Sequence, residues 1–224
     1  MAHAPLRVKP GSKVSLSDID PEGQTSVSKD AAKYRLTKLQ DKLEALQSRL
    51  YAEGKQSLLV VFQAMDAGGK DGTIKTVFRN LNPQGIGVSS FKVPTSEELA
   101  HDFLWRVHAK TPARGMIGVF NRSHYEDVII VRVNELVPES VWEKRFDQIV
   151  AFERLLADTG TRVLKFFLHI SKAEQKARLE DRLKSADEQW KFNIGDLPVR
   201  ARWDDYMRAY EDAISKCSTD AAPW

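Results

Sequence analysis

The residues best suited to chemistry lie just after a short apolar run, residues 58–62. Two glycines, Gly68 and Gly69, are followed by Lys70 and by a segment of helical character, residues 70–81. Glycines allow backbone N–H groups to approach phosphate oxygens, a helix N-terminus contributes partial positive charge, and a lysine contributes a full charge. The stretch therefore predicts a phosphate-binding loop between a strand and a helix, with Lys70 on its solvated surface.

This loop departs twice from the P-loop, or Walker A, pattern G-x-x-x-x-G-K-[ST]. Ala64 occupies the position of the first glycine, and Asp71 replaces the hydroxyl residue that binds magnesium in that pattern. An alternative interpretation is a glycine-rich turn that exposes a lysine without binding phosphate. The loop taken alone leaves both interpretations open.

A polar stretch, residues 121–127, follows another hydrophobic run and is the second candidate. Nucleotide-binding proteins usually place a magnesium-binding carboxylate at the position of Asn121, and a neutral amide oxygen is a weaker ligand. Metal binding would then shift to Asp66, Glu126 or Asp127. The alternative is a polar turn in which a serine or an aspartate caps backbone groups.

The third candidate is a pair of arginines, Arg178 and Arg182, whose spacing of four places both guanidinium groups on one face of a helix. In P-loop kinases, the helix after a late strand carries a cationic lid over the transferring phosphoryl group. Lys75 and Arg79 have the same spacing and could extend this cationic surface. The alternative is a solvated basic face whose charge is balanced by neighbouring acidic residues.

The composition is that of a soluble protein with one full core. The chain has 224 residues, 42% of them hydrophobic, and a formal net charge of +3, which is too small to indicate nucleic-acid binding. The single cysteine, Cys217, rules out an intrachain disulfide. No apolar stretch reaches the roughly 18 residues of a membrane span, and residues 1–30 lack the apolar core of a secretory signal. We expect a cytoplasmic protein with no nucleic-acid or membrane partner.

The elements that must position the candidate residues begin after residue 28. Residues 1–28 lack periodicity and predict an extended arm. Five leucines then recur at spacings of three and four, which predicts a helix that ends near Gly54. This stripe could pack on the sheet or on a second subunit. The leucines are Leu36, Leu39, Leu43, Leu46 and Leu50.

Further strands are predicted at three apolar runs, residues 88–93, 116–120 and 163–170. Strands that alternate with helices imply a parallel sheet with helices on both faces. We therefore predict an α/β fold of three layers, α/β/α, with four or five parallel strands. Residues 29–224 would form a single P-loop kinase-like domain, with a helical lid around residues 172–196.

Helices are predicted where capping boxes precede apolar periodicity, at Thr95, Ser140 and Ser171. The β-branched run at residues 128–133 favours a strand by its composition. It lies too close to the preceding strand for a parallel crossover, however, so we predict a helix there.

The sequence also predicts where two of the helices begin or end. The helix capped at Thr95 would continue through Val107. A single last helix would be capped by Asp196, with Pro198 in its first turn.

Several of these stretches together resemble the second family of polyphosphate kinases, over roughly residues 28–224. The resemblance implies a P-loop kinase-like fold. The sequence Asn-Arg-Ser-His-Tyr-Glu-Asp at residues 121–127 is similar to the subgroup that phosphorylates both nucleoside mono- and diphosphates, where other subgroups have Asp-Arg-Ser-Trp-Tyr-Asn. The stretches that carry the resemblance are residues 46–75, 91–106, 120–128 and 203–206.

The resemblance implies roles for individual residues. The catalytic residues would be Asp66, Lys70, Arg122 and Glu126, and Asp66 and Glu126 would also hold the metal. The nucleotide-binding residues would be Arg106, Asn121, Ser123 and His124. The phosphate-binding residues would be Ala67, Gly68, Gly69, Lys70, Asp71, Gly72, Lys75, Arg178 and Arg182.

The resemblance also implies a reaction. Inorganic polyphosphate would donate a terminal phosphoryl group to AMP or ADP, giving ADP and ATP, reversibly. Mg²⁺ would be the cofactor, with Mn²⁺ as an alternative, and guanine nucleotides are further candidate substrates. A homodimer or a homotetramer is expected, and members of the family usually continue beyond the position of Trp224.

Two other functions stay open. An ATP-dependent nucleoside monophosphate kinase of the thymidylate kinase type is disfavoured by Asp71 and by the lack of an obvious adenine pocket for a second nucleotide. A non-catalytic polyanion-binding protein would need aromatic residues among exposed basic ones. Most aromatic residues here fall instead on apolar helix faces, as at Trp203, Tyr206 and Tyr210.

Overall fold

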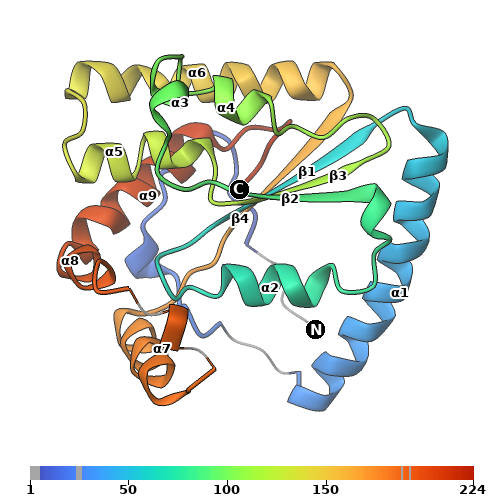
Figure 1. Ribbon diagram of the computed structural model, residues 1–224, viewed down its shortest axis with the longest axis horizontal. Coiled ribbons are helices and arrows are strands. Elements are labelled where there is room, and N and C mark those ends of the chain that lie inside the picture. Colours follow the sequence, from blue (N-terminus) through green and yellow to red (C-terminus); the bar gives the residue numbers. More distant parts are fainter. Residues whose placement is uncertain (1–5, 24–26, 188, 192) are drawn as a thin grey trace.

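A computed structural model of the chain describes residues 6–23, 27–187, 189–191 and 193–224 (Figure 1). Within these ranges, four parallel strands form one sheet in the order β2-β3-β1-β4. Helices cover both faces of the sheet, so the chain has the predicted three-layer α/β/α architecture with four strands (Figure 1).

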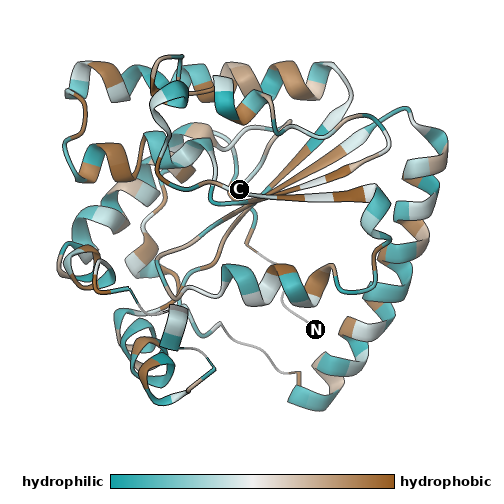
Figure 2. Cartoon of the chain, viewed as in Figure 1, coloured by the Kyte–Doolittle hydropathy of each residue, from teal (hydrophilic) through white to brown (hydrophobic). Residues whose placement is uncertain are grey.

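The sheet is built around β1 (Ser57–Gln63), which lies between β3 (Ile117–Asn121) and β4 (Thr161–Phe167), with β2 (Ile86–Ser90) at one edge. The predicted strands are confirmed, with their ends shifted by up to three residues. The hydropathy colouring shows the strands as largely hydrophobic (Figure 2). Such continuous hydrophobicity is expected of parallel strands, because helices cover both of their faces.

Successive side chains of β1 point to opposite faces of the sheet. Leu59 and Val61 belong to the larger hydrophobic cluster, which α6 (Glu139–Asp158) and α9 (Trp203–Cys217) complete. Val60 and Phe62 belong to the smaller cluster on the other face, beneath the first two helices.

The first helix, α1 (Lys29–Glu53), begins after Ser28, whose side chain accepts a hydrogen bond from a first-turn backbone N–H. It ends, as predicted, at Gly54, whose positive φ of 58° suits a glycine. Only part of its leucine stripe is covered. Leu43 and Leu50 pack against the sheet, whereas Leu39 and Leu46 are about half exposed.

The helix after the phosphate loop, α2 (Lys70–Val77), ends four residues earlier than predicted. The side-chain amide of Gln40 donates to the carbonyl oxygen of Thr76 at 2.5 Å. This hydrogen bond from α1 satisfies one of the carbonyl groups that a helix end leaves unpaired.

The capping box at Thr95 is confirmed, but the helix it begins is short. It forms α3 (Ser96–Leu99), and a separate turn, α4 (Trp105–His108), follows. The carboxylate of Asp102 accepts a hydrogen bond from the backbone N–H of Leu104 at 2.9 Å. An aspartate that bonds the backbone two residues later stabilises a turn in place of a continuous helix, so the predicted extent to Val107 was wrong.

The capping box predicted at Ser140 is also wrong. Helix α6 starts at Glu139 and follows Pro138, so Ser140 lies inside its first turn. Residues 128–133 contain the predicted helix as a single turn, α5 (Ile130–Val133).

The C-terminal third of the chain carries three more helices among the described residues. Ser171 caps α7 (Lys172–Lys184), as predicted. The predicted last helix is divided into α8 (Asp196–Ala201) and α9 by the non-helical backbone of Arg202, and the cap of α8 is Gly195, not Asp196. The remaining short 3-10 turns are η1 (Leu16–Asp18), η2 (Pro83–Gly85), η3 (His124–Asp127) and η4 (Gln189–Lys191).

The described part of the N-terminal arm packs against α9 and the C-terminal residues. Leu16 is buried, and its backbone N–H donates to Glu211 at 2.7 Å. The N–H of Val8 donates to the carbonyl oxygen of Trp224 at 2.9 Å. Among the helices in the described ranges, none is both long and apolar enough to cross a membrane.

Candidate active site

The parallel register brings three strand ends to one edge of the sheet. Phe62 of β1 lies opposite Asn121 of β3, and Gln63 of β1 lies opposite Phe167 of β4. A cleft of about 820 Å³ opens at this edge, between the loop after β1, the end of β3 and α7, the helix of the predicted lid. Clefts beyond the C-terminal ends of parallel strands are the usual ligand sites of such sheets.

The phosphate loop depends on its two glycines. A Cβ atom on Gly68 would lie 2.5 Å from the Cβ of Ala64 and 2.7 Å from the carbonyl oxygen of Met65, so no side chain fits there. Gly69 has a φ of 94°, a backbone angle that residues with a side chain rarely adopt. The loop therefore turns sharply into α2, and the first N–H groups of that helix have no partner within it.

Lys70 lies inside this turn, not on its solvated surface as predicted. Its side chain is only 9% exposed. Its ammonium group donates to the carbonyl oxygens of Ala64 at 2.8 Å and Met65 at 3.3 Å. Burial lowers the pKa of Lys70, although the neighbouring carboxylate of Asp66 opposes this effect. The ammonium group is therefore held where the loop surrounds it.

Asn121, at the end of β3, contacts the phosphate loop. Its side-chain nitrogen donates to the carboxylate of Asp71 at 2.5 Å. Asp71 is the residue that replaces the usual P-loop hydroxyl. The amide of Asn121 thus orients Asp71, a contact that the sequence did not predict.

Arg122 links the same strand end to the loop. Its φ of 62° is unusual for a residue with a side chain, and its guanidinium group donates to Asp66 at 2.7 Å. Burial alone would lower the pKa of Arg122, but Glu126 and Asp66 more than offset it, and the net pKa is raised. Burial raises the pKa of Glu126, and Arg122 and Lys70 oppose that rise.

The four residues predicted to be catalytic lie together. Asp66, Arg122 and Glu126 line a small cavity of about 30 Å³, together with Tyr206 and Tyr210. Lys70 faces the adjoining larger cleft. The site is therefore a group of two cations and two carboxylates behind the phosphate loop.

The lid helix α7 lies directly against the phosphate loop. Arg178 donates to the carbonyl oxygen of Ala67 at 3.2 Å, and the buried side chain of Gln175 donates to that of Asp66 at 2.9 Å. Arg182 lies 4.0 Å from the carboxylate of Asp196, and both arginines line the cleft. Gln175 was not predicted. Its position on the same helix face as Arg178 and Arg182 was the available signal.

Five other predicted residues lie away from the cleft. Ser123 and His124 are fully buried, and Arg106 is nearly so, with its guanidinium group bonded to the carbonyl oxygen of Lys92 at 2.9 Å. Asp127 accepts a hydrogen bond from Arg145 at 3.1 Å, and Lys75 is exposed on α2. Their positions give no support for a direct contact with a ligand.

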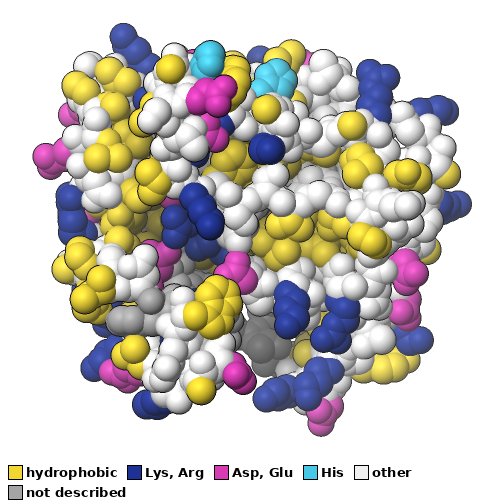
Figure 3. Space-filling model, in the orientation of Figure 1, with side chains coloured by type: hydrophobic (Ala, Val, Ile, Leu, Met, Phe, Trp, Pro, Cys, Tyr) yellow, Lys and Arg dark blue, Asp and Glu magenta, His cyan; other side chains and the backbone are white. Residues whose placement is uncertain are grey.

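The cleft contains residues that the sequence did not single out. Trp190 is 77% exposed and lines the cleft, as do Lys92 and Asn193. The indole nitrogen of Trp190 donates to the carbonyl oxygen of Asp187 at 2.9 Å, which fixes one edge of the ring. The space-filling view shows Lys and Arg side chains on the face that carries α2 and the lid, with Asp and Glu among them (Figure 3).

The carboxylates of the site fit a metal ion that takes only some of its ligands from the protein and the others from the substrate. Among the residues that the structure describes, no group of three or more His, Cys, Asp or Glu side chains is arranged as a metal site. Magnesium in phosphoryl-transfer sites is usually held by one or two carboxylates together with substrate phosphates and water. Asp66 and Glu126, side by side at the small cavity, match that smaller requirement.

A family model described as "Polyphosphate kinase 2 (PPK2)" matches residues 26–224. The chain belongs to this family.

Individual members are similar over nearly the whole chain. An AMP/ADP-polyphosphate phosphotransferase from Meiothermus ruber is 54% identical over 97% of this chain and 82% of its own length. An ADP-polyphosphate phosphotransferase from Rhodopseudomonas palustris is 45% identical over 98% of this chain and 80% of its own. The crystal structure of polyphosphate kinase 2 from Arthrobacter aurescens matches with a TM-score of 0.94 and 45% identity, covering 98% of this chain and 79% of that one.

The buried ammonium of Lys70 gives the first prediction for this polyphosphate kinase 2 family member. Lys70→Met keeps the length of the buried stem but removes the charge that a bound phosphate would meet. We expect kcat to fall by about 100-fold or more, the usual loss for a preorganised electrostatic group. The measurement is steady-state kinetics on protein shown to be folded by circular dichroism.

The control is Lys110→Met, which removes an exposed lysine that does not line the cleft. It should leave kcat unchanged. Near-normal turnover of folded Lys70→Met protein would show that Lys70 does not meet a phosphate.

Proposed function

We propose that this protein transfers a terminal phosphoryl group from inorganic polyphosphate to AMP or ADP, giving ADP and ATP, and that the reaction is reversible. The observation that carries this proposal is the cleft itself, which the phosphate loop and the lid arginines line together. Phosphoryl transfer needs positioning and charge neutralisation more than covalent chemistry. The names of the relatives support the same donor and acceptors.

The charge of the cleft lining indicates that phosphate-rich substrates would need a cation as well as the protein's own side chains. The cleft is lined by five cationic side chains, Lys70, Lys92, Arg122, Arg178 and Arg182. Four carboxylates stand among them, so the described lining has little net charge of its own. Two substrates that each carry several negative charges would bring far more charge than this lining can neutralise. A divalent cation would offset part of that excess negative charge.

We propose Mg²⁺, held by Asp66 and Glu126 together with substrate phosphates, with Mn²⁺ as an alternative. Either ion would neutralise charge that develops on the transferring phosphoryl group. Arg122, which is bonded to Asp66, would lie beside that group. Lys70 and the N–H groups of the first turn of α2 would bind the donor phosphates.

The acceptor would lie under the lid, where Trp190 lines the cleft. Stacking on an aromatic ring tolerates different bases, so guanine nucleotides also fit this arrangement. The predicted homodimer or homotetramer and the cytoplasmic location stay predictions. The half-exposed Leu39 and Leu46 on α1 are compatible with a subunit contact.

One assay distinguishes the proposal from its two alternatives. Purified protein is incubated with AMP or ADP and Mg²⁺, and either polyphosphate or ATP is the donor. The proposal expects product with polyphosphate as donor. Product with AMP and ATP alone would favour the nucleoside monophosphate kinase, and binding of polyphosphate without turnover would favour the non-catalytic protein.

The lid arginines give the second prediction. Arg178→Ala and Arg182→Ala should each raise the KM for polyphosphate by about tenfold, because each removes a charge-assisted contact. The KM for the nucleotide should change less, and polyphosphate binding should weaken as salt rises.

Lys176→Ala is the control, because it removes the same charge from an exposed position of α7 outside the cleft. If the arginine variants moved only the nucleotide KM, or if binding did not depend on salt, the lid would not bind polyphosphate.

Trp190 gives the third prediction, because polyphosphate has no ring to stack. Trp190→Ala should raise the KM for AMP or ADP by about fivefold or more, the loss expected for one base stack, and Trp190→Phe should restore most of it. The KM for polyphosphate should stay within error. Trp105→Ala, which removes a partly exposed tryptophan outside the cleft, serves as the control. An unchanged nucleotide KM in Trp190→Ala would refute the stacking role.

Asn121 gives the fourth prediction. Asn121→Asp would place a second carboxylate 2.5 Å from Asp71, and two carboxylates at that separation must share a proton or a metal. We expect a lower magnesium midpoint and a changed ratio of AMP to ADP phosphorylation, measured with both acceptors across a magnesium titration.

The double variant Asn121→Asp/Asp71→Asn restores one amide and one carboxylate and should return both quantities towards wild type. If Asn121→Asp alone changed neither the midpoint nor the ratio, the contact between Asn121 and Asp71 would have no part in metal or acceptor choice.

A further inference from the structure

Three consecutive side chains between Arg122 and Glu126 are completely buried. Ser123, His124 and Tyr125 all have no exposed surface, although they lie between two residues of the candidate site. They cannot touch a ligand in the cleft. Their conformations nevertheless fix where Arg122 and Glu126 lie, because the backbone of this stretch forms the tight turn η3.

A buried ion pair holds two of these side chains. Glu153 of α6 and Lys165 of β4 are 1% and 3% exposed, and their charged groups lie 2.6 Å apart. The other carboxylate oxygen of Glu153 accepts a hydrogen bond from the hydroxyl of Tyr125 at 2.9 Å and lies 3.2 Å from Nε2 of His124.

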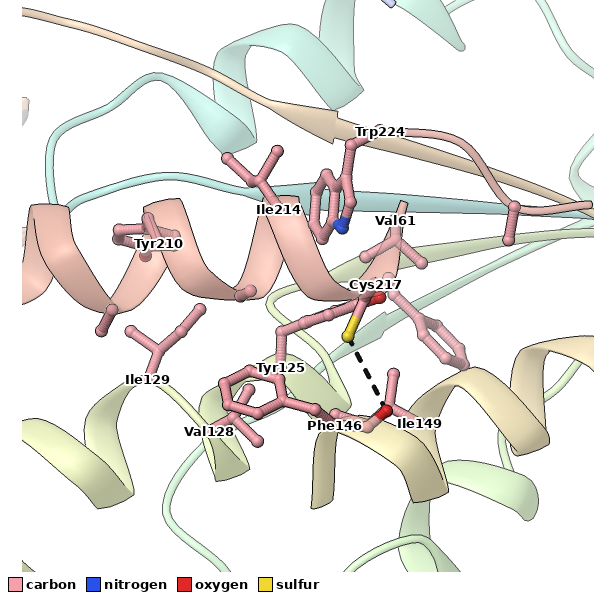
Figure 4. Packing of buried hydrophobic residues seen from close by; sticks show 14 of the residues in the cluster. Val61, Tyr125, Val128, Ile129, Phe146, Ile149, Tyr210, Ile214, Cys217 and Trp224 are labelled. Carbon is pink, nitrogen blue, oxygen red and sulfur yellow. Dashed lines mark hydrogen bonds between the residues drawn. The ribbon is translucent and has the colours of Figure 1, made fainter. Parts of the chain in front are cut away.

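The ammonium group of Lys165 completes the network. It donates to the hydroxyl oxygen of Tyr125 at 2.8 Å and to the carbonyl oxygen of Cys217, at the end of α9, at 2.6 Å. In Figure 4, Tyr125 lies between α9, which carries Cys217, and α6, which carries Phe146. One buried network therefore joins α6, β4, α9 and the turn after β3.

Ser123 is held from the opposite direction. Its hydroxyl oxygen accepts a hydrogen bond from the side-chain amide of Gln63, at the end of β1, at 3.1 Å. The backbone N–H of Arg122 also donates to the carbonyl oxygen of Phe62 at 3.1 Å. The turn is thus anchored on β1 at one end and on the ion pair at the other.

Stability alone does not explain why Glu153 and Lys165 form a buried ion pair. Desolvating two charges costs free energy, and replacing a buried pair with apolar residues of similar volume is often neutral or stabilising. Buried polar networks can instead specify one arrangement of the groups that they bond. The groups bonded here belong to the turn that holds Arg122 and Glu126 at the small cavity.

We infer that Glu153 and Lys165 are positioning residues, which fix His124 and Tyr125 and thereby set Arg122 and Glu126 for phosphoryl transfer. This inference rests on the proposed function for its kinetic test. It also assigns His124 and Tyr125 to the support of the site, not to nucleotide contact.

The test uses variants that do not leave a lone buried charge. Glu153→Leu/Lys165→Met removes both charges together, and Tyr125→Phe removes only the hydroxyl. We expect kcat to fall roughly 10- to 100-fold in the double variant, the scale of a misplacement of about 1 Å, and less in Tyr125→Phe. The KM for polyphosphate should change less than twofold, because the lid and the phosphate loop are untouched.

The control removes a different buried polar pair, one that joins β1 to β4. Ser57 and Thr161 share a hydrogen bond of 2.9 Å at the N-terminal ends of these strands, far from the cleft edge. Ser57→Ala/Thr161→Val should keep kcat. A loss of kcat equal to that of Glu153→Leu/Lys165→Met would mean that any buried polar pair of the sheet matters, and would overturn the inference.

A mutant cycle tests whether the network acts through Arg122. Residues that act as one unit show strongly non-additive effects. Adding Glu153→Leu/Lys165→Met to Arg122→Ala should therefore cost little further activity. Fully additive losses would overturn the inference.

A crystal structure of Glu153→Leu/Lys165→Met separates this inference from the proposed function. We expect the turn at residues 122–126 to be displaced. If it were unmoved, the inference would fail whatever the activity. If wild-type protein used no polyphosphate, the proposed function would fail, while displacement of the turn would still support the positioning role.

Discussion

The structure depends on how the cations that line the cleft are held by the protein itself. Lys70 is buried and bonded to two backbone carbonyl oxygens, and Arg122 is paired with Asp66. Carbonyl dipoles compensate a buried ammonium group only partly, which is why burial lowers the pKa of Lys70. A phosphate oxygen carries more negative charge than a carbonyl oxygen, so we expect it to replace at least one carbonyl partner of Lys70. The ammonium group of Lys70 is thus fixed in place, and the loop around it compensates its charge only in part.

The sheet supplies the second constraint. Parallel pairing places the ends of β1, β3 and β4 at one edge, so the phosphate loop and Arg122 meet without any long connection. Helix α7, the predicted lid, packs against the loop through Arg178 and Gln175. The residues proposed to bind phosphates are therefore concentrated at a single edge of the sheet.

Local signals explain what could be predicted from the sequence. The glycine turn between β1 and α2, the cap at Ser171 and the end of α1 at Gly54 depend on neighbouring residues, and all three appear in the structure. The solvated position of Lys70 was wrong, because burial depends on how the loop folds over its own side chain. The contact of His124 could not be predicted from the sequence, because its partner Glu153 lies in another helix, 29 residues later in the chain. A lone histidine or lysine carries no sequence signal for such a pairing.

A crystal structure of the protein with bound polyphosphate tests the central claim most directly. The account predicts a phosphate within hydrogen-bond distance of the Lys70 ammonium group and of the first N–H groups of α2, with Arg178 or Arg182 on the same chain of phosphates. Lys70 should have exchanged at least one carbonyl oxygen for a phosphate oxygen. Polyphosphate bound elsewhere, with Lys70 still bonded only to Ala64 and Met65, would contradict the account.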